Sequence, residues 1–240
     1  MPSYERSGVV LYYESHGEGF PVLAFAPGGM RSTASIWESS PWSPLRELSG
    51  EWRVIAMDQR NAGRSRAPVG SDDGWHSYTA DHIALLDHLG LERCHVIGGC
   101  IGSSYCLGLM QVAPERVAAA VLQNPIGLAD NREAFYAMFD QWADSLREER
   151  PEVSEQSWGA FRERMYGGDF VFNVSREFVR SCETPMLILA GDDLYHPAAI
   201  SREIADLAPD AERVEHWKDA ESLEAALARV RSFLGAHSPS

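Results

Sequence analysis

The sequence predicts an α/β fold with a mostly parallel central sheet and crossover helices. Short apolar runs alternate with amphipathic segments from one end of the chain to the other, as such a fold requires. No internal repeat, low-complexity stretch or linker interrupts this alternation. The 240 residues can bury a large core, so we expect a single domain over residues 1–240.

The expected elements follow from the apolar runs and the turn residues that end them. We predict strands at residues 9–14, 21–25, 53–57, 94–97, 117–122, 185–190 and 213–217. We predict helices at residues 78–89, from 101 to about 112, 200–207 and 222–234. Gly90, directly after the first of these helices, is a typical C-terminal stop.

The segment at residues 127–180 breaks the alternation. It is helical in pattern, carries mixed charge and is rich in aromatic side chains, including Phe135, Phe139, Trp142 and Trp158. An inserted helical cap explains this segment best. A helical layer packed on the edge of the sheet is the alternative.

Charge and composition restrict the partners. The net charge is −14, which disfavours nucleic acids and anionic membranes, so we expect a small-molecule substrate instead. The chain lacks a signal-peptide pattern and an apolar run of the roughly 20 residues that cross a bilayer. The four cysteines have no CxxC spacing, so a reducing cytoplasmic location is expected. A homodimer is possible, but the sequence does not fix the oligomeric state.

The strongest motif is Gly98-x-Cys100-x-Gly102, between a predicted strand and a predicted helix. A nucleophile on such a tight turn adopts a strained backbone, and glycines beside it remove side chains that would collide. The amides at the start of the helix stabilise a thiolate and an oxyanion. This pattern favours Cys100 as a nucleophile over a small buried cysteine in a turn.

Together with three other segments, this motif resembles the α/β-hydrolase superfamily. Pro27-Gly28-Gly29-Met30 lies where that family usually has its oxyanion loop, and the run from Asp58 to Ser65 is similar to the family's Asp-x-Arg-Gly-x-Gly-x-Ser turn, with Asn61 in place of the first glycine. Pro114-Glu115-Arg116-Val117 matches the segment before the next strand. The resemblance covers nearly the whole chain, and it implies an α/β-hydrolase fold with cysteine in place of the usual serine.

The resemblance also implies an oxyanion hole and an acid. The backbone N–H of Ile101 would be one donor and that of Gly29 the second, with Met30 as the adjacent option; Pro27 has no N–H to donate. The acid would follow the strand that ends near residue 190. Both Asp192 and Asp193 stand there, and the family spacing favours Asp193.

The base is where the sequence departs from the family. The superfamily's histidine follows the last strand in a glycine-rich loop, but no Gly-His occurs there, and Glu221 falls near its place. His216 is in the right segment but inside the predicted strand, which suggests a structural role. His76 would lie on a loop near the entrance. We prefer His196, three residues after Asp193, because that loop borders the nucleophile in this fold.

These residues predict a cofactor-independent hydrolase that acts on an ester, thioester or lactone through a Cys100 acyl-thioenzyme. His196 would be the general base and Asp193 its orienting partner, and no metal-ligand spacing is present. The alternative is a non-hydrolytic member of the same fold, namely a lyase or a ligand-binding or regulatory protein. Its main support is the missing Gly-His.

Overall fold

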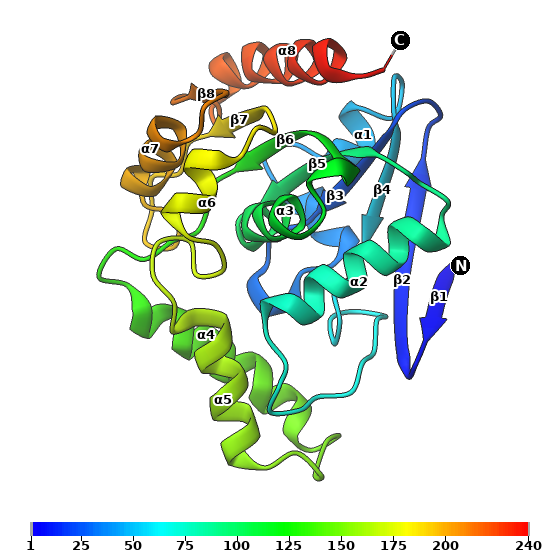
Figure 1. The fold of residues 1–240 in the computed structure, drawn as a ribbon, viewed down its shortest axis with the longest axis vertical. Coiled ribbons are helices and arrows are strands. Elements are labelled where there is room, and N and C mark those ends of the chain that lie inside the picture. Colours follow the sequence, from blue (N-terminus) through cyan, green and yellow to red (C-terminus); the bar gives the residue numbers. More distant parts are fainter. Residues whose placement is uncertain (1, 240) are drawn as a thin grey trace.

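The computed structural model describes residues 2–239, and its centre is one eight-stranded sheet (Figure 1). The strands are β1 (Ser3–Arg6), β2 (Val9–His16), β3 (Pro21–Phe25), β4 (Arg53–Met57), β5 (Cys94–Gly99), β6 (Val117–Gln123), β7 (Met186–Leu189) and β8 (Ala211–Val214). Their order across the sheet is β1-β2-β4-β3-β5-β6-β7-β8. The strands from β4 to β8 in this order pair in parallel, whereas β1 and β2 pair antiparallel at one edge. The predicted α/β-hydrolase fold is confirmed.

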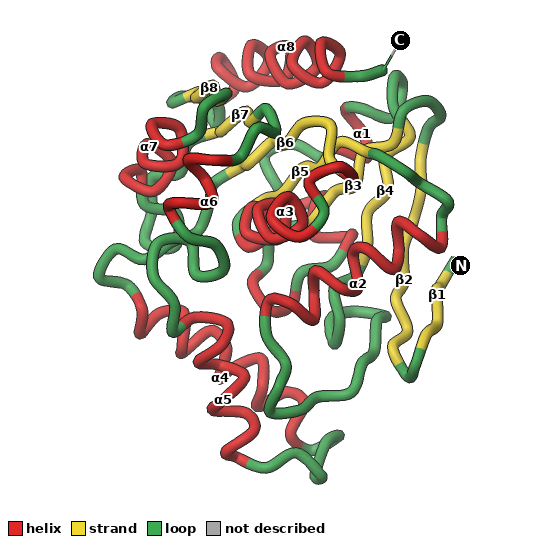
Figure 2. The backbone as a smooth tube through the Cα atoms, viewed as in Figure 1, coloured by secondary structure: helices red, strands yellow, loops and turns green. Residues whose placement is uncertain are grey.

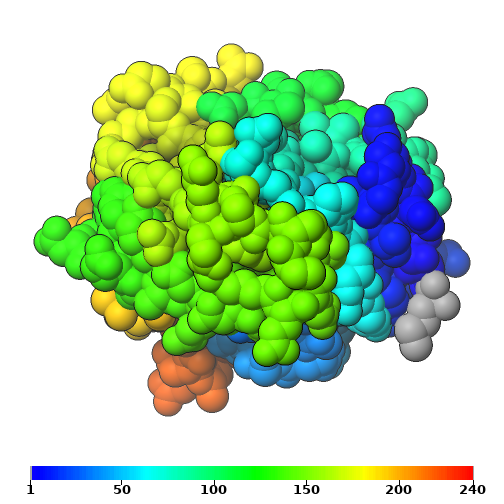
Figure 3. All heavy atoms as spheres, turned by 90° about the horizontal axis from the view of Figure 1, so that it is seen from below, coloured from blue at the N-terminus to red at the C-terminus, as the bar shows by residue number. Residues whose placement is uncertain are grey.

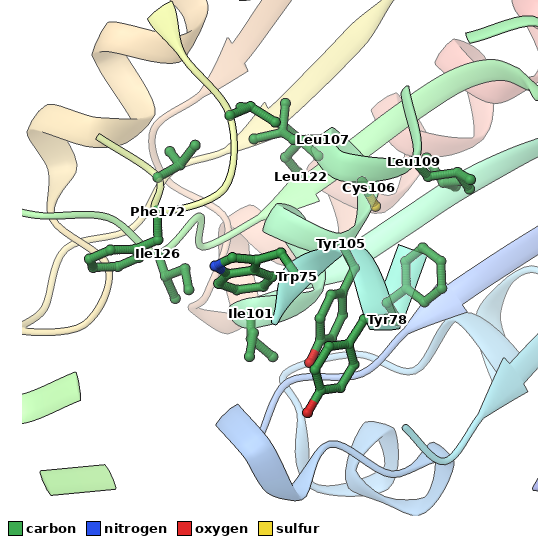
Figure 4. Close-up of a cluster of buried hydrophobic side chains, with 14 of the residues drawn as sticks. Trp75, Tyr78, Ile101, Tyr105, Cys106, Leu107, Leu109, Leu122, Ile126 and Phe172 are labelled. Atoms are coloured by element: carbon green, nitrogen blue, oxygen red, sulfur yellow. The ribbon is translucent and has the colours of Figure 1, made fainter. Parts of the chain in front are cut away.

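Helices cover both faces of the sheet (Figure 2). They are α1 (Pro44–Glu47), α2 (Trp75–His88), α3 (Ile101–Val112), α4 (Arg132–Arg147), α5 (Glu155–Tyr166), α6 (Arg176–Ser181), α7 (Ala198–Leu207) and α8 (Ala220–His237). One apolar cluster lies between the sheet and α2 and α3; part of it is drawn in Figure 4. The second lies on the other face and includes Trp37 and Trp42 together with Phe233 of α8. None of the helices described over residues 2–239 has the length and apolar character needed to span a bilayer.

The segment at residues 127–180 contains α4, α5 and α6. Helices α4 and α5 pack against each other at one end of the molecule, and seen from that end they cover the centre of the face (Figure 3). Their apolar sides bring Phe139, Trp142 and Phe161 together, with ring centroids 5.2 to 5.7 Å apart. The limits of an inserted cap at 127–180 stay a prediction.

Several element boundaries differ by a few residues from the sequence predictions, and three differences need comment, two of which affect the candidate site. Strand β1 was not predicted, because its four residues are mostly exposed and carry no apolar run. Strand β8 ends at Val214, so His216 does not lie in a strand; it is exposed in the connection to α8. Helix α2 begins at Trp75, so His76 is an exposed residue of its first turn and not part of a loop.

Candidate active site

Cys100 lies on a sharp turn between β5 and α3. Its backbone has φ 56° and ψ −120°, a conformation that costs free energy for a residue with a side chain. The flanking glycines permit the turn: a Cβ atom on Gly98 would lie 2.1 Å from the carbonyl oxygen of Gly102, and one on Gly102 would lie 2.2 Å from that of Phe25. The hydroxyl of Ser103 donates a 2.8 Å hydrogen bond to the carbonyl of Gly98 and closes the turn. The predicted strained elbow is therefore present.

The loop after β3 is held beside this turn. The buried carboxylate of Asp58 accepts hydrogen bonds from the backbone N–H groups of Ala34 and Arg64, each 2.9 Å long. The hydroxyl of Ser32 donates to the carbonyl of Ala26 at 2.7 Å, across the loop that contains Gly28 and Gly29. The run from Asp58 to Ser65 thus fixes the loop that contains Gly28 and Gly29, where the sequence predicts an oxyanion hole.

His196 and Asp193 form a pair within the loop between β7 and α7. The Nδ1 atom of His196 lies 2.7 Å from Oδ1 and 2.8 Å from Oδ2 of Asp193. The same Oδ1 accepts the backbone N–H groups of Tyr195 and His196, at 3.0 and 3.1 Å. Asn131, a buried residue before α4, also holds this loop, because its Nδ2 donates a 2.6 Å hydrogen bond to the carbonyl of Leu194.

Cys100 and His196 line the same cavity and change each other's pKa. Burial alone would raise the pKa of the Cys100 thiol, but His196 and the backbone N–H groups of Ile101 and Gly28 lower it below its usual value. Burial alone would lower the pKa of His196, yet Cys100 and Asp193 raise it to about 9. Burial opposes ionisation of Asp193 too, but His196 holds its pKa below the usual range. These shifts favour a thiolate–imidazolium pair oriented by a carboxylate.

Because Nδ1 of His196 is bonded to Asp193, Nε2 is the ring nitrogen that can interact with Cys100. It is buried and has no hydrogen-bond partner of normal geometry within residues 2–239, and only 15% of the side chain is exposed. Catalytic hydrogen bonds are often long or poorly aligned before substrate binds. The lowered pKa of Cys100 and the raised pKa of His196 agree with an electrostatic attraction between the two side chains that line this cavity.

The cavity at this pair is small and largely apolar. Its volume is about 190 Å³, and it is lined by Gly28, Gly29, Cys100, Ile101, Ile126, Phe135, Met138, Tyr166, Tyr195 and His196. A dry engineered cavity of about 150 Å³ binds benzene, whereas drug-sized ligands occupy about 300 Å³ or more. The space next to Cys100 therefore accommodates a compact group.

The segment after β8, where the superfamily usually has its histidine, has a structural role here. Trp217 is buried, and its indole N–H donates a 2.8 Å hydrogen bond to the carbonyl of Ala190 at the end of β7. Lys218 forms an ion pair with Asp192. His216 and Glu221 are exposed, and neither lines the cavity.

The structure thus brings five predicted site residues together: Cys100, Ile101 and Gly29 line the cavity with His196, and His196 binds Asp193. The sequence did not predict a role for the N–H of Gly28, which lowers the pKa of Cys100. It also missed Tyr166 and Tyr195, which line the cavity from α5 and from the loop after β7. A tyrosine in a helix rich in aromatic residues gives no signal that distinguishes a cavity wall from core.

Residues 21–169 match the model of the family described as alpha/beta hydrolase fold, and the chain belongs to that family. It is 35% identical over 133 residues to a protein of Azorhizobium caulinodans named "Putative carbamate hydrolase RutD", a match that covers 54% of this chain and 46% of that protein. A protein of the same name from Pseudomonas syringae pv. syringae is 27% identical over 233 residues, which cover 84% and 88% of the two chains. The chain therefore spans less than half of the first relative and most of the second.

Solved structures agree with the fold. An enol-lactonase from Burkholderia xenovorans LB400 has a TM-score of 0.74 and 22% identity, with 98% of this chain and 100% of that chain covered. A meta-cleavage product hydrolase from Pseudomonas fluorescens IP01 also has a TM-score of 0.74 and 22% identity, with 98% of each chain covered. At this level of identity the likeness shows the shared fold.

Proposed function

We propose that this protein is a cofactor-independent hydrolase that cleaves a small ester, thioester or lactone through an acyl-thioenzyme on Cys100. The observation that carries the proposal is the shared cavity: Cys100 on its strained elbow and His196, whose Nδ1 lies 2.7 Å from Asp193, line the same space. The opposite pKa shifts of Cys100 and His196 support it. The relatives that are named as carbamate hydrolases support hydrolysis as the class of reaction.

In the first half of the reaction, the Cys100 thiolate attacks the carbonyl carbon of the substrate. The negative charge that develops on the carbonyl oxygen is stabilised by the N–H of Ile101 and by the loop of Gly28 and Gly29; one such donor contributes about 3 kcal/mol to transition-state stabilisation. The imidazolium of His196 then gives its proton to the leaving oxygen or sulfur. The alcohol or thiol departs, and the acyl group stays on Cys100 as a thioester.

In the second half, His196 is neutral and acts as a base. It takes a proton from a water molecule, which attacks the thioester carbonyl. When the C–S bond breaks, the acid product leaves, and the thiolate and the imidazolium are both restored. Asp193 keeps Nδ1 of the ring occupied, so that Nε2 is the atom that exchanges the proton.

A cysteine nucleophile suits this geometry. A thiol has a pKa of about 8.5, so it needs much less activation than an alcohol. An interaction with His196 that falls short of an ideal hydrogen bond can therefore suffice. The reduced state that the thiolate needs agrees with the cytoplasmic location expected from the sequence.

The non-hydrolytic alternative rested on the absence of a histidine after the last strand. His196 supplies an imidazole to the nucleophile from a different loop, and this weakens that alternative. The test is hydrolysis of short-chain p-nitrophenyl esters by the protein and by Cys100→Ala. We expect release of p-nitrophenol by the former at well above the background rate and only background release by the latter. Equal rates for both proteins would contradict the proposal.

A further inference from the structure

Three tyrosines from three different helices converge beside the candidate nucleophile. Tyr78 of α2 and Tyr105 of α3 stack with their ring centroids 5.1 Å apart, and Figure 4 shows their oxygen atoms at the same end of the two rings. Trp75 contacts both Tyr105 and Tyr166 of α5, at 5.6 and 6.1 Å between centroids. Tyr166 lines the cavity together with Cys100. We refer to Tyr78, Tyr105 and Tyr166 as the tyrosine cluster.

All three hydroxyl groups are buried, and none has a hydrogen-bond partner among the described residues. The chain does supply partners to neighbouring aromatic groups: the indole N–H of Trp75 donates to the carbonyl of Met165 at 2.6 Å. Single unpartnered polar atoms occur elsewhere, for example on Trp37 and Trp42. Of the three tyrosines, only Tyr166 lines the cavity, and Tyr105 and Tyr78 lie behind it. Their three hydroxyls form a set of donors without partners inside the protein, which a bound molecule that reaches Tyr166 can engage.

The tyrosine cluster offers neutral donors. Burial raises the pKa of Tyr166 and of Tyr105 well above the usual value, and the neighbouring tyrosines and Cys100 raise both further. The hydroxyls therefore stay protonated at neutral pH. The guanidinium of Arg60, 5.7 Å from the ring centroid of Tyr78, has its charge matched by Asp73 and Asp81, at 2.5 and 2.8 Å. The guanidinium of Arg132 binds the backbone carbonyl of Tyr166 and not its hydroxyl.

No lysine or arginine lines the cavity in the part of the chain that the structure describes. A carboxylate buried there would have only neutral donors around it, next to a thiolate, and its desolvation would be costly. A carbonyl or hydroxyl oxygen needs no counter-charge. The tyrosine cluster thus suits an uncharged oxygen better than an anion.

We propose that the tyrosine cluster binds a second, uncharged oxygen on the acyl part of the substrate, so that the preferred substrates are oxo- or hydroxyacyl esters, thioesters or lactones. Tyr166, at the cavity wall, makes the first contact, and Tyr105 and Tyr78 lie behind it. This inference rests on the proposed acyl-thioenzyme, because it assigns the cavity to the acyl group.

The first test compares p-nitrophenyl pentanoate with p-nitrophenyl 4-oxopentanoate, and the butanoate with the 3-oxobutanoate. For at least one pair, Tyr166→Phe should lower kcat/KM for the oxo ester about tenfold more than for the plain ester, the effect of one neutral hydrogen bond in a buried site. For each protein we take the ratio of kcat/KM for the oxo ester to kcat/KM for the plain ester. Dividing the ratio of the variant by that of the unmodified protein removes the difference in intrinsic reactivity between the two esters. Tyr136→Phe is the matched control, because its hydroxyl bonds Glu163 outside the cavity, and it should leave the ratio unchanged.

A second readout requires no turnover. We expect 4-oxopentanamide to protect Cys100 from iodoacetamide at about tenfold lower concentration than pentanamide, and Tyr166→Phe to remove this difference. The phenylalanine variant should melt at the same temperature or higher, because it removes an unpartnered buried hydroxyl. A fall in melting temperature with unchanged protection would assign the hydroxyl a purely structural role and overturn the inference.

The outcomes separate this inference from the proposed function. If no ester is hydrolysed, but protection by the oxo amide depends on Tyr166, the binding site stands and the acyl-thioenzyme fails. If esters are hydrolysed through Cys100, but neither ratio nor protection changes in Tyr166→Phe, the acyl-thioenzyme stands and the tyrosine cluster is not a binding site. A preference for p-nitrophenyl hydrogen succinate, whose acyl group carries a carboxylate, would overturn the choice of an uncharged oxygen.

Discussion

The Nδ1 atom of His196 lies 2.7 Å from the Oδ1 atom of Asp193, and the two residues are separated in the chain by only Leu194 and Tyr195. The proposed base and its proposed orienting carboxylate therefore belong to one loop after β7. The segment after β8 is free to pack Trp217 against the end of the sheet. The proposed triad of Cys100, His196 and Asp193 therefore depends on the conformation of a single loop, to which Asn131 donates a hydrogen bond at the carbonyl of Leu194.

The thiols should differ in reactivity. Cys100 is partly accessible and its pKa is lowered, whereas Cys94 and Cys106 are buried with raised pKa values, that of Cys94 to about 12. At pH 7, iodoacetamide should therefore label Cys100 at least about tenfold faster than Cys94, Cys106 or the buried Cys182, as measured by peptide mass spectrometry. Equal, slow labelling of all four would contradict the nucleophile assignment.

The paired histidine should be needed for turnover. His196→Ala should reduce kcat/KM for a p-nitrophenyl ester by about 10²–10³-fold, close to the loss in Cys100→Ala, because the members of such a set act together. Asp193→Asn should lower kcat/KM less, about tenfold, because the ring of His196 stays in the same cavity as Cys100. Asp192→Asn is the matched control, because Asp192 binds only Lys218, and it should change little.

Other outcomes would reassign the base. The exposed position of His216 now predicts that His216→Ala affects neither stability nor turnover, in contrast to the structural role expected from a strand position. Loss of turnover in His216→Ala but not in His196→Ala would make His216 the base. If neither histidine matters while Cys100 does, Glu221 becomes the candidate.

The ion pair should contribute stability over a defined pH range. The folded-state pKa of His196 is about 9, above its ordinary 6.5, so its contribution is complete below pH 6.5 and is lost as the pH rises through about 9. The folded-state pKa of Cys100 is lowered, so its contribution is complete above about pH 8.5 and is lost as the pH falls through the lowered value. Between about pH 6.5 and 8.5 the contribution of His196 falls and that of Cys100 rises as the pH increases, so their sum stays nearly constant in the part of this range above the lowered pKa of Cys100. We call this range the plateau.

Denaturant unfolding across pH 5–10 measures this effect when the protein is compared with the double variant Cys100→Ala/His196→Ala. The difference in the free energy of unfolding should be flat over the plateau and should decrease on both sides. A difference that rises from pH 7 to about pH 8.5 and then stays constant to pH 10 would mean that a neutral histidine faces a thiolate, and the imidazolium would be ruled out.

The size of the cavity should set the acyl specificity. Met138 lines the cavity from α4 and is only partly buried, so Met138→Ala enlarges the cavity without removing a fully buried side chain. We expect the preferred p-nitrophenyl ester to become longer by about two to four carbons, at a cost of up to about 2 kcal/mol in stability. Ala137→Gly, one residue away and exposed, is the control. An unchanged chain-length profile would place the acyl group elsewhere.

Most of the sheet and the elbow could be predicted from the sequence because their signals are local. Strands β3 and β4 have the predicted bounds, since each is a buried apolar run bordered by turn residues. The glycines of the elbow are needed for close backbone approach, and this requirement is visible in the sequence. Strand β8 was predicted at residues 213–217 but spans Ala211–Val214, and Trp217 lies beyond it with its indole N–H bonded to the carbonyl of Ala190, a long-range contact that has no local sequence signal.

Spatial relationships between distant segments were harder to predict. The pairing of Asp193 with His196 could be inferred because both lie in one short loop. The approach of Gly28 to the sulfur depends on how the loop after β3 is braced by Asp58. Convergence of Tyr78, Tyr105 and Tyr166 depends on the packing of three helices, for which the sequence has no local pattern.

The most direct test of the account is to trap the acyl-enzyme. The protein is mixed with p-nitrophenyl butanoate in excess, quenched with acid during the first turnovers, and analysed by intact and peptide mass spectrometry. We predict a mass increase of one butanoyl group on the peptide that contains Cys100, removable by hydroxylamine and absent in Cys100→Ala. Turnover with no adduct on Cys100, or undiminished turnover by Cys100→Ala, would contradict the account.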